Sequence, residues 1–298
     1  MDEESHMKNV GKKRSLTIAT IAFTPHDQMK ENIDRVIELI VKLKESNGDI
    51  DLFIFGEMIL SEYKMEKEYI HQNALNINSE LMMKLRTLCS ELRINLTFGF
   101  SEEEEGVYYN SQVLIDRTGR IVCVHRKSNL TAGENRVFEK GDRFITFTEL
   151  EGVKIALSIC YDLFGSGCRS LLKENAPDLL IHSLADPQNG HFVTGVNGRI
   201  STCHYVSANR FSKEGKTDFP GHIGIVSRAG KILELKTNKA QHIIKKISLK
   251  PIQSLIIRFF LRLSNNVLFL FHIIFHIKRV ISYLRWNLKM KTQKKQIG

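Results

Sequence analysis

The amino-acid sequence predicts an α/β fold in one large domain. Short apolar runs of strand length alternate with amphipathic segments of helix length over most of the 298 residues. A chain of this length can bury a large core, and the alternation favours one domain of about 250 residues. The five cysteines are too few and too irregularly spaced for a disulfide scaffold, and no Cys-x-x-Cys pair suggests zinc binding. A reducing, intracellular setting follows as the expectation.

The first half of the domain is predicted to contain strands separated by two helices. Apolar residues at helical spacing follow the first strand, and Asn78 or Ser79 can cap the second helix. The acidic run at 102–105 is expected to be a solvated turn. The predicted elements are a strand at 15–23, a helix at 29–44, a strand at 51–55, a helix from 78 or 79 to about 92 and a strand at 95–100.

The second half is predicted to begin with a hairpin around Arg117-Thr118-Gly119. After an irregular stretch, further strands alternate with helical segments, of which the one at 188–203 is weakly patterned. The predicted elements are hairpin strands at 110–116 and 120–127, strands at 144–147, 152–160 and 178–183, a helix at 188–203 and strands at 205–208, 222–226 and 232–235.

The apolar run that begins at Gly152 ends in Cys160-Tyr161-Asp162. The turn Gly165-Ser166-Gly167 follows, and we interpret it as the elbow between this strand and the next helix. A thiol would then lie at the mouth of a sheet, where turn amides and a helix N-terminus favour a thiolate and a developing oxyanion. Cys160 is therefore a candidate nucleophile.

Two charged residues end other predicted buried strands, namely Glu57 and Lys127. Strand ends are where α/β folds gather their reactive groups. Taken singly, a cysteine at a strand end is usually a small buried hydrophobic residue, and a Glu and a Lys are usually an ordinary ion pair. The remaining cysteines, Cys89, Cys123, Cys168 and Cys203, are interpreted as packing residues.

In their order along the chain, these residues resemble the carbon-nitrogen hydrolase, or nitrilase, superfamily. The resemblance spans roughly residues 15–245 and rests on an ordered set of short motifs rather than on one of them. The matching pieces are Phe55-Gly56-Glu57-Met58, Arg126-Lys127-Ser128-Asn129-Leu130, Gly133-Glu134 with Phe138 and Gly141-Asp142, Ile159-Cys160-Tyr161-Asp162 with Arg169, Ala208-Asn209-Arg210 and Gly221-His222-Ile223-Gly224.

The resemblance implies a four-layer αββα sandwich, in which two sheets pack face to face under helices, and it implies a homodimer. It also implies a role for each matched residue. Cys160 would be the nucleophile, Glu57 the proton carrier, Lys127 a stabiliser of the thiolate and oxyanion, and Glu134 the residue that orients the lysine and substrate. Tyr161, through its backbone N–H, Asp162 and Ser183 would form the oxyanion and substrate-binding site.

Several positions depart from the pattern of the family. Gly56 replaces a usual Pro, Asn129 replaces a usual His, and Gly165-Ser166 replaces a usual Pro-Glu. Ser183 leads into Leu184 to Pro187 rather than into Asn and Trp. The pair Tyr161-Asp162, in place of Trp-Glu, resembles the amidase branches rather than the true nitrilases. These departures leave the substrate open.

The function predicted from these residues is hydrolysis of a non-peptide amide through an acyl thioester on Cys160, without metal or organic cofactor. One alternative is transfer of the same acyl group to an amine, on a lipid-like substrate at a membrane. A second alternative is a catalytically silent, membrane-associated scaffold, because several pocket motifs are altered.

The net charge of +10 belongs to the C-terminal end of the chain. From Lys245 onward there are twelve Lys or Arg and no Asp or Glu, and the remaining 31 basic and 33 acidic residues leave a charge of −2 on residues 1–244. This distribution argues against a nucleic-acid groove on the domain. The predicted division is a disordered leader at 1–14, the hydrolase domain at 15–250 and a basic, apolar helical tail at 251–298.

The tail is predicted to be an amphipathic helix that lies on an anionic membrane surface through residues 252–295. A polar stripe includes Arg258, His272 and Arg279, and Lys289 to Lys295 are cationic. Its longest stretch without Lys or Arg is about 15 residues, short of the roughly 20 that span a bilayer. Packing on the domain or on a partner subunit remains the main alternative. The leader lacks an apolar segment, so the expected location is cytoplasmic, peripheral at the inner face of a membrane.

Overall fold

The computed structural model describes residues 15–165, 167–188, 196, 200, 202–214 and 217–249. The predictions for the leader and for the C-terminal tail lie outside these residues, as does most of the helix expected at 188–203. The first half contains β1 (Ser15–Ala22), α1 (Met29–Ser46), β2 (Leu52–Ile54), α2 (Lys67–Asn73), α3 (Glu80–Leu92), β3 (Asn95–Glu104), β4 (Val107–Ile115) and β5 (Ile121–Arg126).

The second half contains two short 3₁₀ helices besides its strands and one described α-helix. Its elements are η1 (Glu134–Arg136), β6 (Thr146–Leu150), β7 (Val153–Ile159), η2 (Cys160–Phe164), α4 (Cys168–Asn175), β8 (Leu179–Leu184), β9 (His204–Asn209), β10 (Phe211–Glu214), β11 (Thr217–Pro220), β12 (Ile223–Val226), β13 (Ile232–Lys236) and β14 (Gln241–Ser248).

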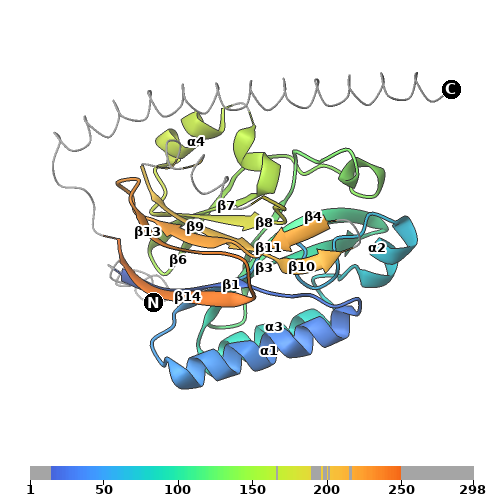
Figure 1. Cartoon of the computed structure of the whole chain (residues 1–298), viewed down its shortest axis with the longest axis horizontal. Coiled ribbons are helices and arrows are strands. Elements are labelled where there is room, and N and C mark those ends of the chain that lie inside the picture. Colours follow the sequence, from blue (N-terminus) through green and yellow to red (C-terminus); the bar gives the residue numbers. More distant parts are fainter. Residues whose placement is uncertain are drawn as a thin grey trace, which may run out of the picture.

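Two six-stranded sheets form the centre of the molecule (Figure 1). Their strand orders are β14-β1-β2-β3-β4-β5 and β13-β12-β9-β8-β7-β6. Each has a parallel core, β1-β2-β3 in the first sheet and β7-β8-β9 in the second. Helices α1 and α3 cover the outer face of the first sheet, and α4 lies beyond the second (Figure 1). The predicted αββα sandwich is confirmed.

Three apolar clusters fill the three interfaces between the four layers. One lies between α1, α3 and the first sheet and includes Ile33, Val36 and Phe98. A second fills the space between the sheets and includes Leu157 and Val206. The third lies under α4. Because each sheet is covered on both faces, its central strands are mostly apolar and almost entirely buried, as β7 and β8 show.

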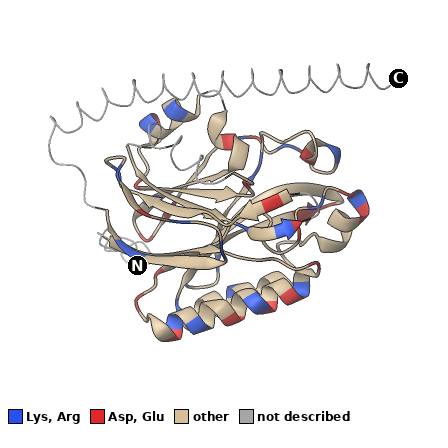
Figure 2. Ribbon diagram, in the orientation of Figure 1, with Lys and Arg blue, Asp and Glu red and all other residues tan. Residues whose placement is uncertain are grey.

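Helix α1 presents its charged residues to solvent and its apolar residues to the sheet. Figure 2 shows basic and acidic residues at intervals along its ribbon, and its buried residues are Asn32, Ile33, Val36, Ile40 and Leu43. Helix α3 begins as predicted, since the hydroxyl of Ser79 accepts a hydrogen bond from the Met82 N–H at 3.3 Å. These features explain why both helices could be recognised from the sequence alone.

The prediction of a solvated turn at 102–105 holds only for the end of this run, since the turn begins at Glu105. Strand β3 continues through Glu104, and the side chain of Glu102 is only 1 % exposed. Its carboxylate accepts two hydrogen bonds from the Arg126 guanidinium, both at 2.8 Å, and one from the Ser111 hydroxyl. This forked ion pair with the antiparallel neighbours explains how an acidic residue is buried within the strand.

Three strands of the structure were not predicted. The β10–β11 hairpin has few apolar residues, and the polar residues of β14 occur in pairs rather than alternately, so the pattern of a strand is concealed. β14 pairs antiparallel with β1 over eight residues, so the chain crosses from the second sheet back to the edge of the first. Only this long-range pairing turns the segment into a strand.

We expect Gly141→Ala to destabilise the protein by about 1–3 kcal/mol, because an added Cβ would lie 2.0 Å from the carbonyl oxygen of Arg126. The Gly141 N–H also donates to the Lys127 carbonyl at 2.9 Å. Gly48→Ala is the matched control, since its Cβ would meet no atom within 4 Å. Urea unfolding of both variants checks this, and equal midpoints would contradict it.

Candidate active site

Glu57 lies shortly after β2, beside the end of β8 in the second sheet. A Cβ on Gly56 would lie 3.0 Å from the carbonyl oxygen of Leu184, and a Cβ on Gly99 would lie 2.7 Å from the Cα of Glu57. Glycine at both positions therefore lets three backbones meet. The Glu57 N–H donates to the Leu184 carbonyl at 3.2 Å, and the Ala185 N–H donates to Glu57 Oε2 at 2.8 Å.

Lys127 follows β5 and is anchored through both of its backbone polar groups. Its N–H donates to the Asn110 carbonyl at 2.8 Å, and its carbonyl accepts from Gly141. The Nζ atom lies 2.7 Å from Glu57 Oε1 and 2.7 Å from Glu134 Oε1. All three side chains are fully buried. The structure thus brings together three of the four residues predicted to be catalytic in one desolvated ion network.

Two residues that sequence reasoning missed complete this network. Asn110 Nδ2 donates to Glu57 Oε1 and to Glu134 Oε1, both at 2.8 Å, and the Tyr63 hydroxyl donates to Glu134 Oε1 at 2.9 Å. Asn110 lies within β4 and Tyr63 lies in the irregular segment before α2. No local pattern distinguishes either of them from an ordinary strand or loop residue, so only the packed structure identifies them.

The loop carrying Glu134 is held by a short reciprocal motif. The Thr131 N–H donates to Glu134 Oε2 at 2.7 Å, and the Glu134 N–H donates to the Thr131 hydroxyl at 3.3 Å. Arg210 is fully buried and holds the segment at 58–63. It donates hydrogen bonds to the carbonyls of Met58 and Ser61, at 3.3 and 2.9 Å, and to the Glu214 carboxylate. The Tyr63 N–H also donates to Glu214. These contacts fix the Tyr63 hydroxyl on Glu134.

The two carboxylates differ in their protonation behaviour. Burial raises the pKa of Glu57, and the neighbouring charge of Glu134 adds to this effect. Burial acts in the same direction on Glu134, but the Lys127 ammonium and the hydrogen bonds from Thr131 and Tyr63 hold its pKa below the usual value. Burial disfavours the Lys127 ammonium, yet Glu57 and other nearby groups raise its pKa well above normal. Glu57 is therefore the carboxylate suited to exchange a proton.

Cys160 directly follows β7 and is the first residue of η2. Its φ is +44°, in the left-handed region that a non-glycine residue rarely adopts, and its side chain is 4 % exposed. Gly167, with a φ of +86°, directly precedes α4, as predicted for the turn before the helix, but Cys160 is a second residue with positive φ that was not predicted. Helix α4 begins only at Cys168, whose Sγ contacts the Asp162 carbonyl oxygen at 3.1 Å, as expected for a packing residue.

The thiol of Cys160 is electrostatically coupled to the buried network. Burial raises the pKa of the thiol well above its usual value, the Glu57 charge raises it further, and the Lys127 charge lowers it. Cys160 packs with Leu184, the residue whose carbonyl binds the Glu57 N–H. Desolvation is the largest of these effects, and it favours the protonated thiol over the thiolate.

The remaining predicted site residues have different surroundings. Asp162 accepts hydrogen bonds from the N–H groups of Ser128 and Asn129 at 3.0 and 2.6 Å and contacts His125 Nε2 at 3.0 Å. It thus holds the segment that follows Lys127. The Ser183 hydroxyl donates to the Phe55 carbonyl at 3.2 Å, tying the sheets together beside Gly56. The Tyr161 side chain is 43 % exposed, and its N–H belongs to the peptide that follows Cys160.

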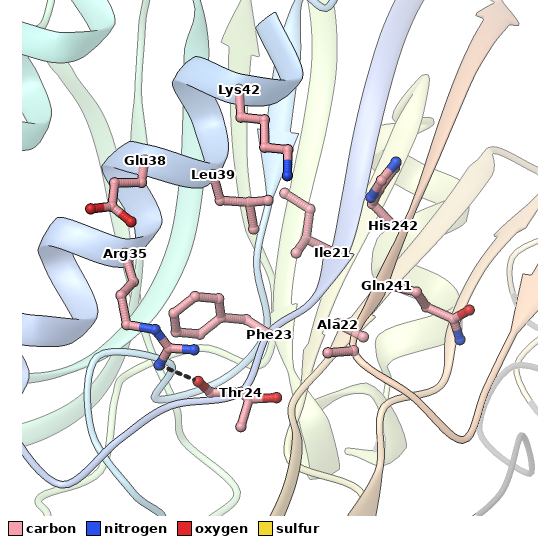
Figure 3. A pocket seen from close by; sticks show the side chains of 11 residues that line it. Ile21, Ala22, Phe23, Thr24, Arg35, Glu38, Leu39, Lys42, Gln241 and His242 are labelled. Carbon is pink, nitrogen blue, oxygen red and sulfur yellow. Dashed lines mark hydrogen bonds between the residues drawn. The ribbon is translucent and has the colours of Figure 1, made fainter. Parts of the chain in front are cut away.

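A separate groove of about 350 Å³ lies between α1 and the start of β14. Figure 3 shows Arg35 and Lys42 of α1 on one side and Gln241 and His242 on the other, with Ile21 on the floor. Among the described residues that line it, none belongs to the Glu57–Lys127–Cys160 set, so this groove is not where the predicted chemistry would take place. Within the same part of the chain, no group of three or more His, Cys, Asp or Glu is placed to hold a metal ion.

Comparison with known proteins identifies the family. A sequence model of the family described as Carbon-nitrogen hydrolase matches residues 17–257. The chain belongs to the carbon-nitrogen hydrolase family. It is a hydrolase of the amidase-like branch that acts on non-peptide carbon-nitrogen bonds, as the sequence predicted.

Individual relatives and solved structures agree with this assignment. The chain is 26 % identical over 223 residues to a probable nitrilase of Schizosaccharomyces pombe, covering 72 % of this chain and 82 % of that protein. It is 32 % identical over 132 residues to an (R)-stereoselective amidase of Pseudomonas sp., covering 44 % and 46 %. The amidase of Nesterenkonia sp. AN1 has the same fold, with a TM-score of 0.70, 18 % identity and coverage of 78 % and 90 %.

In the described part of the carbon-nitrogen hydrolase chain, no helix is both long enough and apolar enough to cross a membrane.

Proposed function

We propose that this carbon-nitrogen hydrolase cleaves a small-molecule amide through an acyl thioester on Cys160. The observation that carries the proposal is the buried contact of Lys127 Nζ with both Glu57 and Glu134 at 2.7 Å. Burying three ionisable groups is costly unless they are paired, and such clusters are typical of active sites. The charges of this cluster act directly on the Cys160 thiol.

In the proposed first step, Sγ of Cys160 attacks the amide carbonyl carbon while the thiol proton passes to Glu57. The carbonyl oxygen becomes an oxyanion beside the Lys127 ammonium and the Tyr161 N–H. The carbon-nitrogen bond then breaks, and Glu57 returns the proton to the departing amine. The raised pKa of Glu57 suits it to both transfers, because a carboxyl group with a pKa nearer neutrality accepts and releases protons readily.

In the second step, water attacks the thioester carbon and gives one proton to Glu57. The carbon-sulfur bond breaks, the carboxylic acid leaves, and the Cys160 thiol recovers its proton from Glu57. Glu134, whose pKa is lowered, stays ionised and keeps the Lys127 ammonium in place together with Asn110. Transfer of the acyl group to an amine would follow the same path, with the amine in place of water.

The experiment is to incubate the full chain with a panel of simple amides and to follow product release and intact mass. We expect Cys160→Ala to abolish both turnover and the acyl adduct, whereas Cys123→Ala, which removes a half-buried thiol, should retain them. Fluoroacetamide is a useful probe, because a mutant of the amidase from Nesterenkonia sp. AN1 shows covalent addition of its acetamide moiety at the active-site cysteine. Turnover that persists without Cys160 would sink the proposal, and a wild-type chain without adduct or turnover would favour the silent scaffold.

The acyl acceptor can be measured in the same assay. Adding hydroxylamine divides the thioester between hydrolysis and hydroxamate formation. A hydrolase should release mainly acid when amines are present at low concentration, whereas an acyltransferase should form mainly the amide or hydroxamate.

We also propose that the basic C-terminal segment binds anionic membranes and that the protein forms a homodimer. The first proposal rests on the absence of acidic residues from Lys245 onward. Replacing Lys289, Lys291, Lys294 and Lys295 by Glu should reduce co-sedimentation of the full chain with vesicles that contain phosphatidylglycerol. A control with Lys30, Lys42, Lys67 and Lys84 changed to Glu should sediment like the wild type. Equal loss in both variants would contradict a specific role of the tail.

Light scattering of the full chain measures the oligomeric state, and a monomer in solution would contradict the proposed homodimer.

A further inference from the structure

A buried histidine holds the peptide group between Cys160 and Tyr161. His182 Nε2 lies 2.9 Å from the carbonyl oxygen of Cys160, and His182 Nδ1 lies 2.9 Å from the hydroxyl oxygen of Tyr205. The side chains of His182 and Tyr205 are fully buried, and their rings pack edge to face with centroids 5.8 Å apart. These contacts form a chain from the interior of the second sheet to the backbone of the candidate nucleophile.

Only one tautomer of His182 satisfies both contacts. A carbonyl oxygen can only accept, so Nε2 must carry the proton and donate it to Cys160. Burial lowers the pKa of His182 to about 3, so the ring is neutral and its Nδ1 has a lone pair. Nδ1 therefore accepts the hydrogen bond from the Tyr205 hydroxyl, which selects the tautomer that points an N–H at Cys160.

The orientation of this carbonyl also determines where the Tyr161 N–H points. The peptide bond is planar and trans, so the Cys160 C=O and the Tyr161 N–H point in opposite directions. With the carbonyl directed at His182, the N–H is directed away from it. The next peptide is held as well, because Asn129 Nδ2 donates to the Tyr161 carbonyl at 2.9 Å. Both peptide planes that flank Tyr161 are thereby fixed.

Such support is needed because the backbone at Cys160 is strained. A non-glycine residue at φ +44° costs about 1–2 kcal/mol, and it persists only where neighbouring contacts hold it. His182 is suited to this task by its position in a rigid element. It lies in β8, between Ser158 of β7 and Ser207 of β9 in the parallel ladder.

We propose that His182 is a positioning residue for the oxyanion site: through the Cys160 carbonyl it aims the Tyr161 N–H at the substrate oxygen, and Tyr205 fixes the required tautomer. The inference rests on the proposed function, in which that N–H stabilises the oxyanion. A donor that is held in advance at the position of developing charge costs no reorganisation during the reaction. The hydrogen bond to the carbonyl also polarises the peptide and strengthens its N–H as a donor.

The test compares two reactions of Cys160 in variants of the full chain. Acylation by an amide forms an oxyanion, whereas alkylation by iodoacetamide at its saturated carbon does not. We expect His182→Phe to lower kcat for amide hydrolysis by about 10–100-fold, below the loss of about 100–1000-fold seen when an oxyanion donor itself is removed, with KM nearly unchanged. The rate of alkylation should stay within about twofold, because that reaction makes no use of the Tyr161 N–H.

Conservative variants and a matched control sharpen the result. His182→Gln can present an N–H near the position of Nε2 and should recover most of kcat, whereas His182→Asn reaches only the position of Nδ1 and should not. Tyr205→Phe should give a smaller loss than His182→Phe, because the ring remains but its tautomer is no longer selected. His26→Phe changes an exposed histidine and should behave like the wild type. Equal losses in kcat and in alkylation for His182→Phe would indicate general disruption and would overturn the inference.

The tautomer can be read independently of activity. Long-range ¹H–¹⁵N NMR on the resting protein should show His182 protonated at Nε2 and unprotonated at Nδ1, and Tyr205→Phe should shift this balance. A ring protonated at Nδ1 would overturn the inference even in an active enzyme. This NMR measurement uses the unmodified protein, so it remains decisive if His182→Phe does not fold. The proposed function fails by a different result, the lack of any adduct or turnover that depends on Cys160.

Discussion

Replacing Lys127 with Met is expected to lower the free energy of unfolding by about 3–5 kcal/mol and to abolish amide turnover. Lys127 is the buried cation between two carboxylates, and both contacts are 2.7 Å long. Methionine preserves much of the volume but leaves Glu57 and Glu134 facing one another without a compensating charge. The cost comes from desolvated charge rather than from lost packing.

Lys64 supplies a matched control for this variant. Its Nζ also contacts two carboxylates, those of Asp27 and Glu62, but its side chain is 41 % exposed. Water screens such surface pairs, so Lys64→Met should cost no more than about 1 kcal/mol. Urea unfolding at neutral pH measures both variants. Similar costs for the two would show that burial does not determine the effect.

A double variant and the pH dependence test the explanation. In the Lys127→Met protein, adding Glu57→Gln should recover part of the lost stability, because it removes one uncompensated carboxylate. The orphaned carboxyl groups should also have raised pKa values in the folded state. The folded state would then bind protons more tightly than the unfolded state, so the destabilisation should shrink as the pH falls toward 5.

Glu57→Gln is expected to reduce kcat for amide hydrolysis by about 100–10,000-fold, the usual contribution of a general acid-base group. Glutamine keeps the shape and the contact with Lys127 but cannot accept the thiol proton. The fold should survive, because Glu134 still pairs with Lys127 and accepts from Asn110. Steady-state kinetics together with urea unfolding separate the two effects.

The pH profile of the unmodified enzyme offers a second test of Glu57. Burial raises the pKa of Glu57 above its usual value of 4.5. The protonated carboxylic acid cannot take the thiol proton, so kcat/KM should fall as the pH is lowered through this raised pKa. The acid limb should therefore lie above pH 4.5. A profile that is flat down to pH 4, or a Glu57→Gln enzyme that keeps the same acid limb, would remove Glu57 from this role.

Much of the site could be predicted because its residues follow apolar strands that are visible in the sequence. Lys127 and Cys160 come directly after β5 and β7, and Glu57 comes shortly after β2, so all three lie at or near the ends of strands, where α/β folds gather reactive groups. Glu134 came only from the resemblance to the family, yet it is the second carboxylate on Lys127. Asp162 and Ser183 were predicted at the oxyanion and substrate site, and in the structure both make hydrogen bonds to backbone groups of neighbouring segments.

Other features depend on contacts between segments that are distant in the chain. Asn110 and Tyr63 reach Glu134 from 24 and 71 residues away, and no local pattern marks them. Glu102 was expected in solvent, but the guanidinium of Arg126 across the sheet buries it. The chain reversal was expected at the glycines, which are the residues most tolerant of a positive φ. Gly167 does have a positive φ before α4, but so does Cys160 at the end of β7, where His182, 22 residues away, holds the carbonyl.

Local sequence thus determines the α/β architecture and the candidate reactive side chains, because hydrophobic periodicity and strand boundaries depend on neighbouring residues. The shifted pKa values of the buried groups and the direction of the Tyr161 N–H depend instead on the packed structure. Desolvation, pairing and the planarity of a single peptide act only after the two sheets have closed around Lys127 and Cys160.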